Sequence, residues 1–168
     1  MPAAFHVRRV LARDLDRIQE IEDASFGKDA YDRKLFAEYH RKCGGLFLVA
    51  VRRRRICGYA ITCTSSVASA GEVISIAVDP VVRQSGAASA LMTSTLRRLC
   101  RRGIARLTLM VKVTNRPARR FYEKWGFRKL RRVPKYYEDG RDGILMRRGV
   151  GLQTCGRRTR SGNRAGTT

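Results

Sequence analysis

Apolar residues recur along residues 5–148 with the spacing of strands and helices. The run Val73–Val78 is apolar, rich in β-branched residues and too short for a helix, which predicts a buried strand. A helix follows, with Leu91, Leu96 and Leu99 on its apolar face. Arg106–Val113 then alternates apolar and polar residues, so the helix is predicted to cross over between two parallel strands.

The other segments of this region add helices and strands of ordinary length. Helical spacing of apolar residues predicts amphipathic helices over Arg13–Phe26, Asp32–Lys42 and Pro117–Trp125. Further strands are predicted at Phe5–Val10, Leu46–Val51, Ile56–Thr64, Phe127–Val133 and Ile144–Arg147, with a hairpin turn at Arg52–Arg55 and a loop at Ser65–Gly71. Residues 1–148 thus form one domain, and the Gly-, Thr-, Ser- and Arg-rich residues 149–168 are predicted to be a disordered basic tail.

The turn between the central strand and its helix has the features of an anion-binding site. Asp79-Pro80 stops the strand, and Arg83-Gln84-Ser85-Gly86-Ala87-Ala88 leads into the helix. The first amides of a helix lack partners within it, and small side chains let a diphosphate approach the backbone closely. On spacing alone, a simple packing turn explains the stretch equally well. The spacing fits neither a nucleotide P-loop nor a Rossmann turn.

Length and composition indicate a globular protein that carries an excess of positive charge. The chain has 168 residues, of which 43% are hydrophobic and 30% charged. No apolar run is long enough to span a bilayer and no signal peptide opens the chain, so we expect a cytoplasmic protein without a membrane partner. The net charge of +22 favours weak, nonspecific attraction of polyanions. Codon composition explains the excess of arginine equally well, and no aromatic-interleaved basic patch indicates specific RNA binding.

Cysteine and histidine usage gives no metal-ligand pattern. The five cysteines are odd in number, no two have C-x-x-C spacing, and His6 and His40 are the only histidines. We therefore expect no metal site and five reduced thiols, at Cys43, Cys57, Cys63, Cys100 and Cys155.

Two motifs in order carry a family resemblance. Arg83, Gly86 and Ala88, directly after SIAVDP, resemble the R/Q-x-x-G-x-G/A acetyl-CoA signature of the GCN5-related N-acetyltransferases. The segment from Asn115 to Phe127 is similar to the N-x-x-A-x-x-x-Y-x-x-x-G-F motif of the same family. The segment 136–146 resembles the closing segment of the branch that acetylates protein N-termini, the ribosomal-protein-alanine acetyltransferases.

The resemblance implies a fold and a cosubstrate. The implied fold is α/β, with a mixed, mostly antiparallel sheet that is splayed at its centre and flanked by helices on both faces. The implied cosubstrate is acetyl-CoA, with no metal. Its pantetheine arm pairs with the backbone of the splayed strand, which also supplies a backbone oxyanion donor. The residues implied for cofactor binding are Ile76, Ala77, Val78, Arg83, Gln84, Ser85, Gly86, Ala87, Ala88, Ser89 and Asn115.

The resemblance also implies catalytic roles, with one departure. Tyr122 matches the tyrosine that acts as general acid toward the leaving thiolate. Met110 stands where the ribosomal-protein branch has its general-base glutamate, and a thioether cannot take that proton. Either the base has moved, or solvent replaces it, or the protein is not a competent catalyst. Glu72, at the head of the splayed strand, is the best replacement, acting through a water. Phe26 and Tyr31 are candidates to line the acceptor pocket.

The predicted function is acetyl transfer to an amine. An α-amine with a pKa near 7.7–8.0 is roughly 10% neutral at pH 7, whereas a lysine amine near 10.4 is far less so. A weak base therefore favours a protein N-terminus as acceptor, in agreement with the subfamily resemblance. The alternatives are a small-molecule amine or lysine acceptor and, in another class, a non-catalytic CoA-binding or basic nucleic-acid-associated protein. The oligomeric state is left open.

Overall fold

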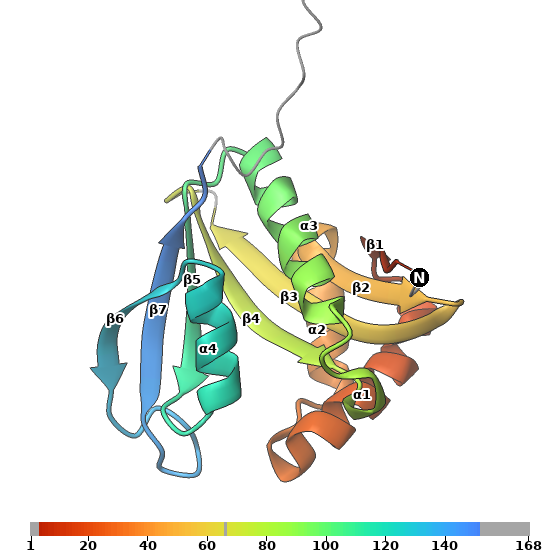
Figure 1. Ribbon diagram of the computed structural model, residues 1–168, viewed down its shortest axis with the longest axis horizontal. Coiled ribbons are helices and arrows are strands. Elements are labelled where there is room, and N and C mark those ends of the chain that lie inside the picture. Colours follow the sequence, from red (N-terminus) through yellow and green to blue (C-terminus); the bar gives the residue numbers. More distant parts are fainter. Residues whose placement is uncertain (1–3, 66, 152–168) are drawn as a thin grey trace, which may run out of the picture.

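The computed structural model describes residues 4–65 and 67–151, which form a single seven-stranded sheet between layers of helices (Figure 1). The strand order is β1-β2-β3-β4-β5-β7-β6, and only the β4–β5 pair is parallel. The predicted mixed, mostly antiparallel sheet is therefore confirmed. Its strands are β1 His6–Arg9, β2 Phe47–Arg52, β3 Arg55–Ser65, β4 Ala70–Val78, β5 Arg106–Lys112, β6 Arg128–Val133 and β7 Gly143–Gly149.

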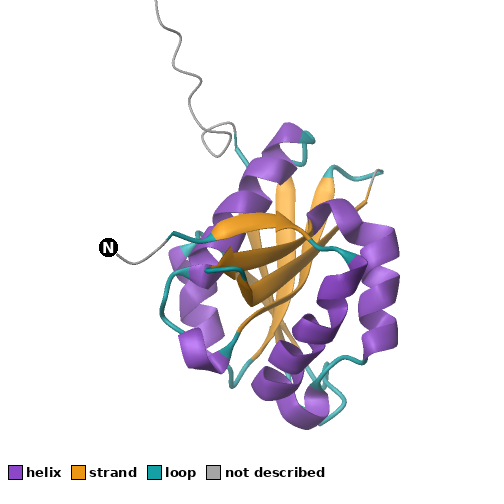
Figure 2. Cartoon of the chain, turned by 90° about the vertical axis from the view of Figure 1, so that its right-hand side faces the viewer, coloured by secondary structure: helices purple, strands orange, loops and turns teal. Residues whose placement is uncertain are grey.

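Helices cover both faces of the sheet (Figure 2). One core lies between the sheet and the first two helices, and it contains Ile18, Phe36 and Tyr59. The other lies beneath the last two helices, and it contains Leu96 and Tyr122. The four helices are α1 Leu15–Phe26, α2 Arg33–Cys43, α3 Ala87–Arg101 and α4 Arg116–Lys124, with short 3-10 turns η1 Ala12–Asp14, η2 Gly27–Asp29, η3 Gly44–Leu46 and η4 Pro80–Val82.

Local sequence signals set the ends of these helices. Asp32 caps α2 by accepting a hydrogen bond from the Leu35 amide at 2.8 Å, and Asn115 caps α4 by accepting from the Ala118 amide at 3.3 Å. Gly27 ends α1 with a φ of 55°, which a residue with a Cβ adopts reluctantly. The first amides of these helices thus find the partners that the helix itself does not provide.

The central strands β4 and β5 separate partway along their length (Figure 1). They pair only where Ala70–Val73 runs beside Arg106–Leu109, although both strands continue beyond this point. A bulge in β4 coincides with the separation: Thr62 of β3 pairs with Val73 and Ile61 pairs with Ser75, so Ile74 is the extra residue. The sheet therefore opens into a V whose inner edge is the backbone of residues 74–78.

Two predicted boundaries differ in the structure. The predicted loop at Ser65–Gly71 is shorter, because β3 extends to Ser65 and β4 begins at Ala70. The tail was predicted to start at residue 149, but Gly149 is the last residue of β7. Val150 is also ordered: it is buried against the core beneath α3, and its amide donates a hydrogen bond to the Ala105 carbonyl at 2.9 Å. The rest of the predicted tail, 152–168, lies outside the described residues.

The prediction of five reduced thiols is wrong, because Cys43 and Cys63 form a disulfide across 5.2 Å between their Cα atoms. Cys43 ends α2 and Cys63 lies on β3, so the bond joins the helix to the face of the sheet on which it packs. Their separation of 20 residues gave no motif, and only the packing of α2 over β3 brings them together. Within the described residues, no helix is long and apolar enough to cross a membrane, and no group of three or more His, Cys, Asp or Glu residues is placed to hold a metal.

The tight turn between β2 and β3 is built from two residues with unfavourable backbone angles. Arg53 and Arg54 have φ values of 49° and 65° and connect the paired residues Arg52 and Arg55. Positive φ at both central positions is the geometry that Asn-Gly adopts readily and arginine does not.

We therefore expect the double substitution Arg53→Asn/Arg54→Gly to raise the free energy of unfolding by about 1 kcal/mol, since it relieves strain at both positions. Urea denaturation at pH 7 measures this difference. The double substitution Arg53→Gly/Arg54→Val is the control, because a β-branched residue at positive φ is expected to destabilise the turn. Equal midpoints for all three proteins would contradict the account of the turn.

Candidate active site

The separation of β4 and β5 opens into a cavity of about 570 Å³. One wall is β4 with its neighbour α1, the opposite wall is β5 with α4, and the rim is formed by η2 and by the loop between β6 and β7. Among the sequence-predicted residues, Ile76, Asn115 and Tyr122 line this cavity, as do the two acceptor-side candidates Phe26 and Tyr31. The residues that line the cavity include Glu22, Phe26, Tyr31, Ser75, Ile76, Met110, Lys112, Asn115, Tyr122, Tyr137 and Asp139.

Tyr122 reaches the cavity from the buried face of α4. Its ring is packed edge-on between Phe121 and Phe127, with centroid distances of 5.6 Å to each, and the residue is 7% exposed. Burial raises the pKa of the Tyr122 phenol well above its ordinary value, because the phenolate loses water and gains no compensating charge. Tyr122 therefore holds its proton at neutral pH and can donate it into the cavity.

Glu22 is a buried carboxylate in the cavity wall, and sequence reasoning missed it. It is 2% exposed and accepts hydrogen bonds from the Tyr31 amide at 2.9 Å and from the Tyr59 hydroxyl. Burial raises the pKa of Glu22, while these two hydrogen bonds oppose the shift. A signal was present in the sequence: Glu22 lies four residues after Ile18, on the apolar face of its helix, where a charged residue is out of place.

The Tyr59 hydroxyl links Glu22 to the splayed strand. Tyr59 is fully buried on β3, and its hydroxyl lies 3.1 Å from the Ser75 Oγ. Ser75 itself lies on β4 immediately after the bulge and lines the cavity. A continuous chain of hydrogen bonds therefore runs from the Glu22 carboxylate on α1, by way of the Tyr59 hydroxyl on β3, to the Ser75 hydroxyl on β4 at the inner edge of the V.

Lys112, the last residue of β5, connects the two parts of the cavity rim. Its Nζ donates to Asp29 Oδ2 at 3.0 Å and to Asp139 Oδ2 at 2.8 Å, and it lies 5.1 Å from the centre of the Tyr137 ring. Hydrogen bonding to Asp139 and Asp29 raises the pKa of Lys112, although burial opposes it. One ammonium group thus connects η2, β5 and the loop between β6 and β7.

The cavity is acidic in a strongly basic protein. Its lining carries four carboxylates against two lysines, whereas the whole chain has a net charge of +22. A cation that enters this cavity therefore gains an attraction that the rest of the surface does not offer. The charged lining residues are Glu22, Asp29, Glu138 and Asp139 on one side and Lys28 and Lys112 on the other.

The predicted diphosphate turn lies beyond the end of β4 and outside the lining of this cavity. Gly86 precedes α3 with a φ of 92°, and no side chain within the described residues caps this helix end. A Cβ at Gly86 would meet nothing within 4 Å, so space is open there. The Ser85 Oγ is buried without a hydrogen-bond partner in the described chain. Unpaired amides, open space and an orphaned hydroxyl fit a phosphate ligand.

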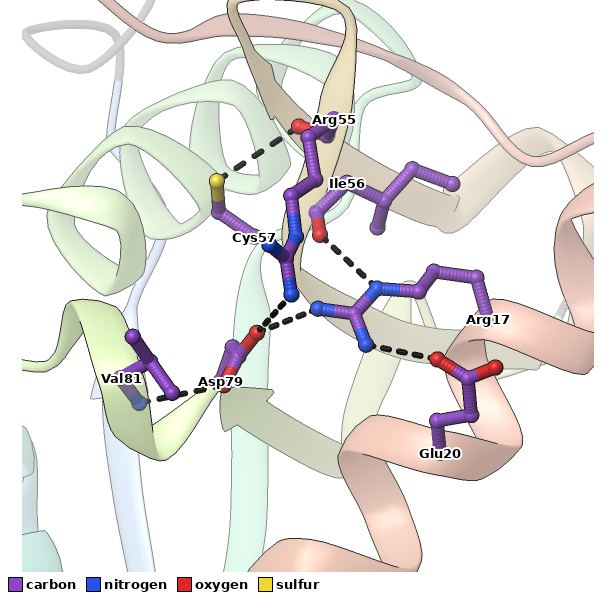
Figure 3. A network of polar contacts seen from close by, with 7 residues as sticks. All are labelled: Arg17, Glu20, Arg55, Ile56, Cys57, Asp79 and Val81. Carbon is purple, nitrogen blue, oxygen red and sulfur yellow. Dashed lines mark hydrogen bonds and ion pairs between the residues drawn. The ribbon is translucent and has the colours of Figure 1, made fainter.

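An ion-pair network fixes the end of β4 from which this turn departs (Figure 3). Asp79 accepts from the Arg17 guanidinium of α1, from Arg55 at 3.5 Å, and from the Val81 amide at 3.1 Å. Arg17 also donates to the Ile56 carbonyl at 3.3 Å and pairs with Glu20 at 2.7 Å. Burial alone would raise the pKa of Asp79, but these donors and charges hold it below its usual value. The network thus joins α1, β3 and the start of η4.

Met110 and Glu72, the two residues considered for the position of the general base, lie in different places. Met110 lines the cavity, so a thioether does occupy this position of the wall. Glu72 is exposed, pairs with Thr108 where β4 and β5 still run together, and is not part of the cavity lining. Glu72 lies opposite Cys63 of β3, whose disulfide to Cys43 of α2 identifies this as the side of the sheet covered by α2.

Comparison with known proteins supports this geometry. Residues 14–127 match the model of the acetyltransferase (GNAT) family. The chain is 37% identical to an uncharacterized N-acetyltransferase of Methanocaldococcus jannaschii, over 83% of this chain and 88% of the relative. It is 30% identical to an N-alpha-acetyltransferase of Saccharolobus solfataricus, and the match covers 86% of this chain and 92% of the relative. The crystal structure of the ribosomal-protein-S18-alanine N-acetyltransferase from Escherichia coli superposes with a TM-score of 0.78 at 25% identity, covering 88% of this chain and 95% of that one.

The network around Asp79 gives a prediction for stability. Asp79→Asn is expected to lower the free energy of unfolding at pH 7 by about 1–3 kcal/mol, because it removes the buried carboxylate that pairs with the partly buried Arg17 guanidinium. The pKa of Asp79 is lower in the folded protein than in the unfolded chain. The contribution of Asp79 to stability is therefore complete above the unfolded pKa of about 3.9, and it is lost as the pH falls through the folded pKa.

Urea unfolding of wild type and Asp79→Asn at several pH values between 7 and 2.5 measures the effect. The difference between the two proteins should shrink as the pH falls below about 3.9, the unfolded pKa of Asp79. Glu20→Gln, which removes the exposed partner of Arg17, is the matched control and should change stability little. A difference that persists unchanged at pH 2.5 would show that the ion pair is not its source.

Proposed function

Because the chain belongs to the acetyltransferase (GNAT) family and is an N-acetyltransferase, we propose that it transfers an acetyl group from acetyl-CoA to the α-amine of a protein N-terminus, as the ribosomal-protein-type enzymes do. The observation that carries this proposal is the cavity between β4 and β5, where an unpaired backbone edge, a protonated phenol and an acidic lining come together. We propose a cytoplasmic location for the same reaction.

The described residues offer acetyl-CoA two kinds of contact. The inner edge of β4 at Ile76, Ala77 and Val78 has no ladder partner on the side of β5, so its backbone groups are open to an extended chain. The turn Arg83–Ser89 offers unpaired helix amides, a guanidinium and the Ser85 hydroxyl to a diphosphate. Asn115 lines the cavity while its side chain caps α4. When bound, acetyl-CoA supplies an acetyl group activated as a thioester.

Tyr122 is the general acid in this proposal. The departing sulfur needs a proton, and the buried phenol keeps one available across the neutral pH range. The aromatic packing against Phe121 and Phe127 fixes the ring, so the hydroxyl is aimed without a loss of side-chain freedom during the reaction.

Glu72 is the proposed general base, acting through water. Met110 cannot accept a proton, and Glu72 lies outside the cavity lining, so direct contact with the acceptor amine is not part of the proposal. The exposed Glu72 carboxylate on β4 can instead take the proton from a water that enters along the strand. Such a distant base suits an amine that is already partly neutral in solution, and an α-amine meets this requirement better than a lysine.

The lining of the cavity favours a cationic acceptor. An N-terminal amine arrives mainly as an ammonium ion, and the four carboxylates of the lining favour its entry. The relative from Saccharolobus solfataricus carries the name N-alpha-acetyltransferase, which agrees with an α-amine as the acceptor. The same attraction serves a small amine or a lysine side chain, so these acceptors belong in the test.

A non-catalytic, CoA-binding protein is the second candidate, and Met110 in the cavity wall is the observation that favours it.

The test measures CoA release from acetyl-CoA with peptides that begin with Ala, Ser or Met, with lysine peptides blocked at the N-terminus, and with polyamines. We expect turnover with the free N-terminal peptides. Tyr122→Phe should lower kcat about 100-fold, since a positioned general acid contributes on this scale, and should leave the KM of acetyl-CoA almost unchanged. Glu72→Gln should lower kcat about tenfold because its base acts through water.

The outcomes separate the candidates. Turnover of only polyamines or lysine peptides would contradict the N-terminal acceptor. Tight acetyl-CoA binding without turnover of any amine would favour the non-catalytic candidate. Full activity in Glu72→Gln would exclude this residue as the base.

A further inference from the structure

Glu22, Tyr59 and Ser75 form a buried hydrogen-bond chain that the proposed chemistry leaves unused. The chain connects helix α1, strand β3 and strand β4, and its last member lies on the inner edge of the V. A fully buried tyrosine and a carboxylate that is 2% exposed are costly to place in a core that apolar residues would fill more stably.

The direction of each hydrogen bond in this chain is determined by its first member. The Glu22 carboxylate has no proton to give, so it accepts from both the Tyr31 amide and the Tyr59 hydroxyl. Tyr59 has one proton and donates it to Glu22. The contact of 3.1 Å between the Tyr59 and Ser75 oxygens therefore requires Ser75 to be the donor. With its only proton committed to Tyr59, the Ser75 oxygen can offer only lone pairs to the cavity.

We propose that Ser75 is a hydrogen-bond acceptor for the N–H of the acceptor amine, and that Glu22 and Tyr59 are positioning residues that keep its oxygen in this orientation. The inference rests on the proposed function, because it concerns the amine of the same reaction. A neutral amine that donates one N–H to Ser75 has its lone pair restricted to a narrower range of directions. Ser75 is adjacent to Ile76, the first of the residues proposed to bind the thioester arm, so this restriction acts beside the reacting carbonyl.

The placement of Ser75 agrees with this role. The bulge at Ile74 shifts the alternation of β4, so that Ser75 faces Tyr59 and the helices α1 and α2, the side on which Phe26 and Tyr31 line the cavity. The acceptor enters a region rich in carboxylates there, and Ser75 supplies a fixed, uncharged acceptor at the strand itself.

Glu22→Gln is the decisive substitution because it reverses the chain. A glutamine can still accept from the Tyr31 amide through its Oε1, but its Nε2 then donates to Tyr59. Tyr59 would donate to Ser75, and Ser75 would direct its proton toward the amine. Tyr59→Phe instead removes the link and lets the Ser75 hydroxyl rotate freely. The proposal therefore predicts that Glu22→Gln lowers kcat more than Tyr59→Phe does.

The experiment measures kcat and both KM values by CoA release, with whichever acceptor of the panel the wild-type enzyme turns over fastest. We expect Ser75→Ala to lower kcat about tenfold, the value of one well-placed hydrogen bond, with the KM of acetyl-CoA within about twofold of wild type. Ser75→Thr keeps the hydroxyl and should retain most of the activity. Tyr39→Phe is the matched control, since it removes a hydroxyl from the aromatic cluster around Tyr31 without touching the chain.

Two readouts separate positioning from a merely structural role. In the Ser75→Ala background, Glu22→Gln should have almost no further effect on kcat, because the oxygen that it orients is gone. Thermal unfolding should also show no loss for Glu22→Gln at pH 7. The folded pKa of Glu22 is raised, so its contribution to stability is present below the unfolded pKa and is lost as the pH rises through the folded value.

The results that would overturn the role of Ser75 differ from those that would overturn the proposed function. Wild-type activity in folded Ser75→Ala or Glu22→Gln overturns this inference and leaves the proposed function standing. Additive losses in the double variant, or a Ser75→Thr variant as weak as Ser75→Ala, also overturn it. A wild-type protein that turns over no amine overturns the proposed function, and the role assigned to Ser75 falls with it.

Discussion

The parting of β4 and β5 is the constraint on which the rest of the site depends. A parallel pair at the centre of a sheet would normally continue its ladder, and each buried peptide group left without a partner carries a cost. Here the pairing stops after Val73 and Leu109, and a bulge at Ile74 turns the strand away. Helix α4, anchored by the buried Tyr122, and helix α1 hold the two halves at this opening. The unpaired edge is thereby available to an extended ligand.

The two ends of the opening have opposite electrostatic character. Toward the start of α3, unpaired helix amides and Arg83 are suited to a phosphate, and the Asp79 network anchors that end to α1. Toward η2 and the loop between β6 and β7, carboxylates outnumber lysines by four to two. A cosubstrate with a diphosphate and an acceptor with an ammonium group are thus attracted to different ends and meet between the strands. The overall charge of +22 is uninformative about this local arrangement.

Much of the fold was predictable because its signals are local. Asp32, Asn115 and Gly27 mark helix ends by their own chemistry, and the alternation in Arg106–Lys112 identifies a strand without reference to its neighbours. Tyr122, which the family resemblance singled out, does line the cavity.

What the sequence could not provide depends on contacts between distant segments. The Cys43–Cys63 disulfide and the connection of Lys112 to Asp29 exist only because helices fold back onto the sheet. Glu22 did carry a weak signal, as a charge on an apolar helix face, but its partner Tyr59 lies 37 residues away. Glu72 lies at the head of the strand, as predicted, but the sequence could not show that it is exposed and lies outside the lining of the cavity.

Hydrogen–deuterium exchange in the presence and absence of CoA tests the central claim most directly, because it reports on the backbone itself. The account predicts new protection in peptides that cover residues 74–78 and 84–89, with β1 and β6 unchanged. Protection confined to other segments, with the inner edge of β4 exchanging as fast as in the free protein, would contradict the claim that the parted strands form the binding site.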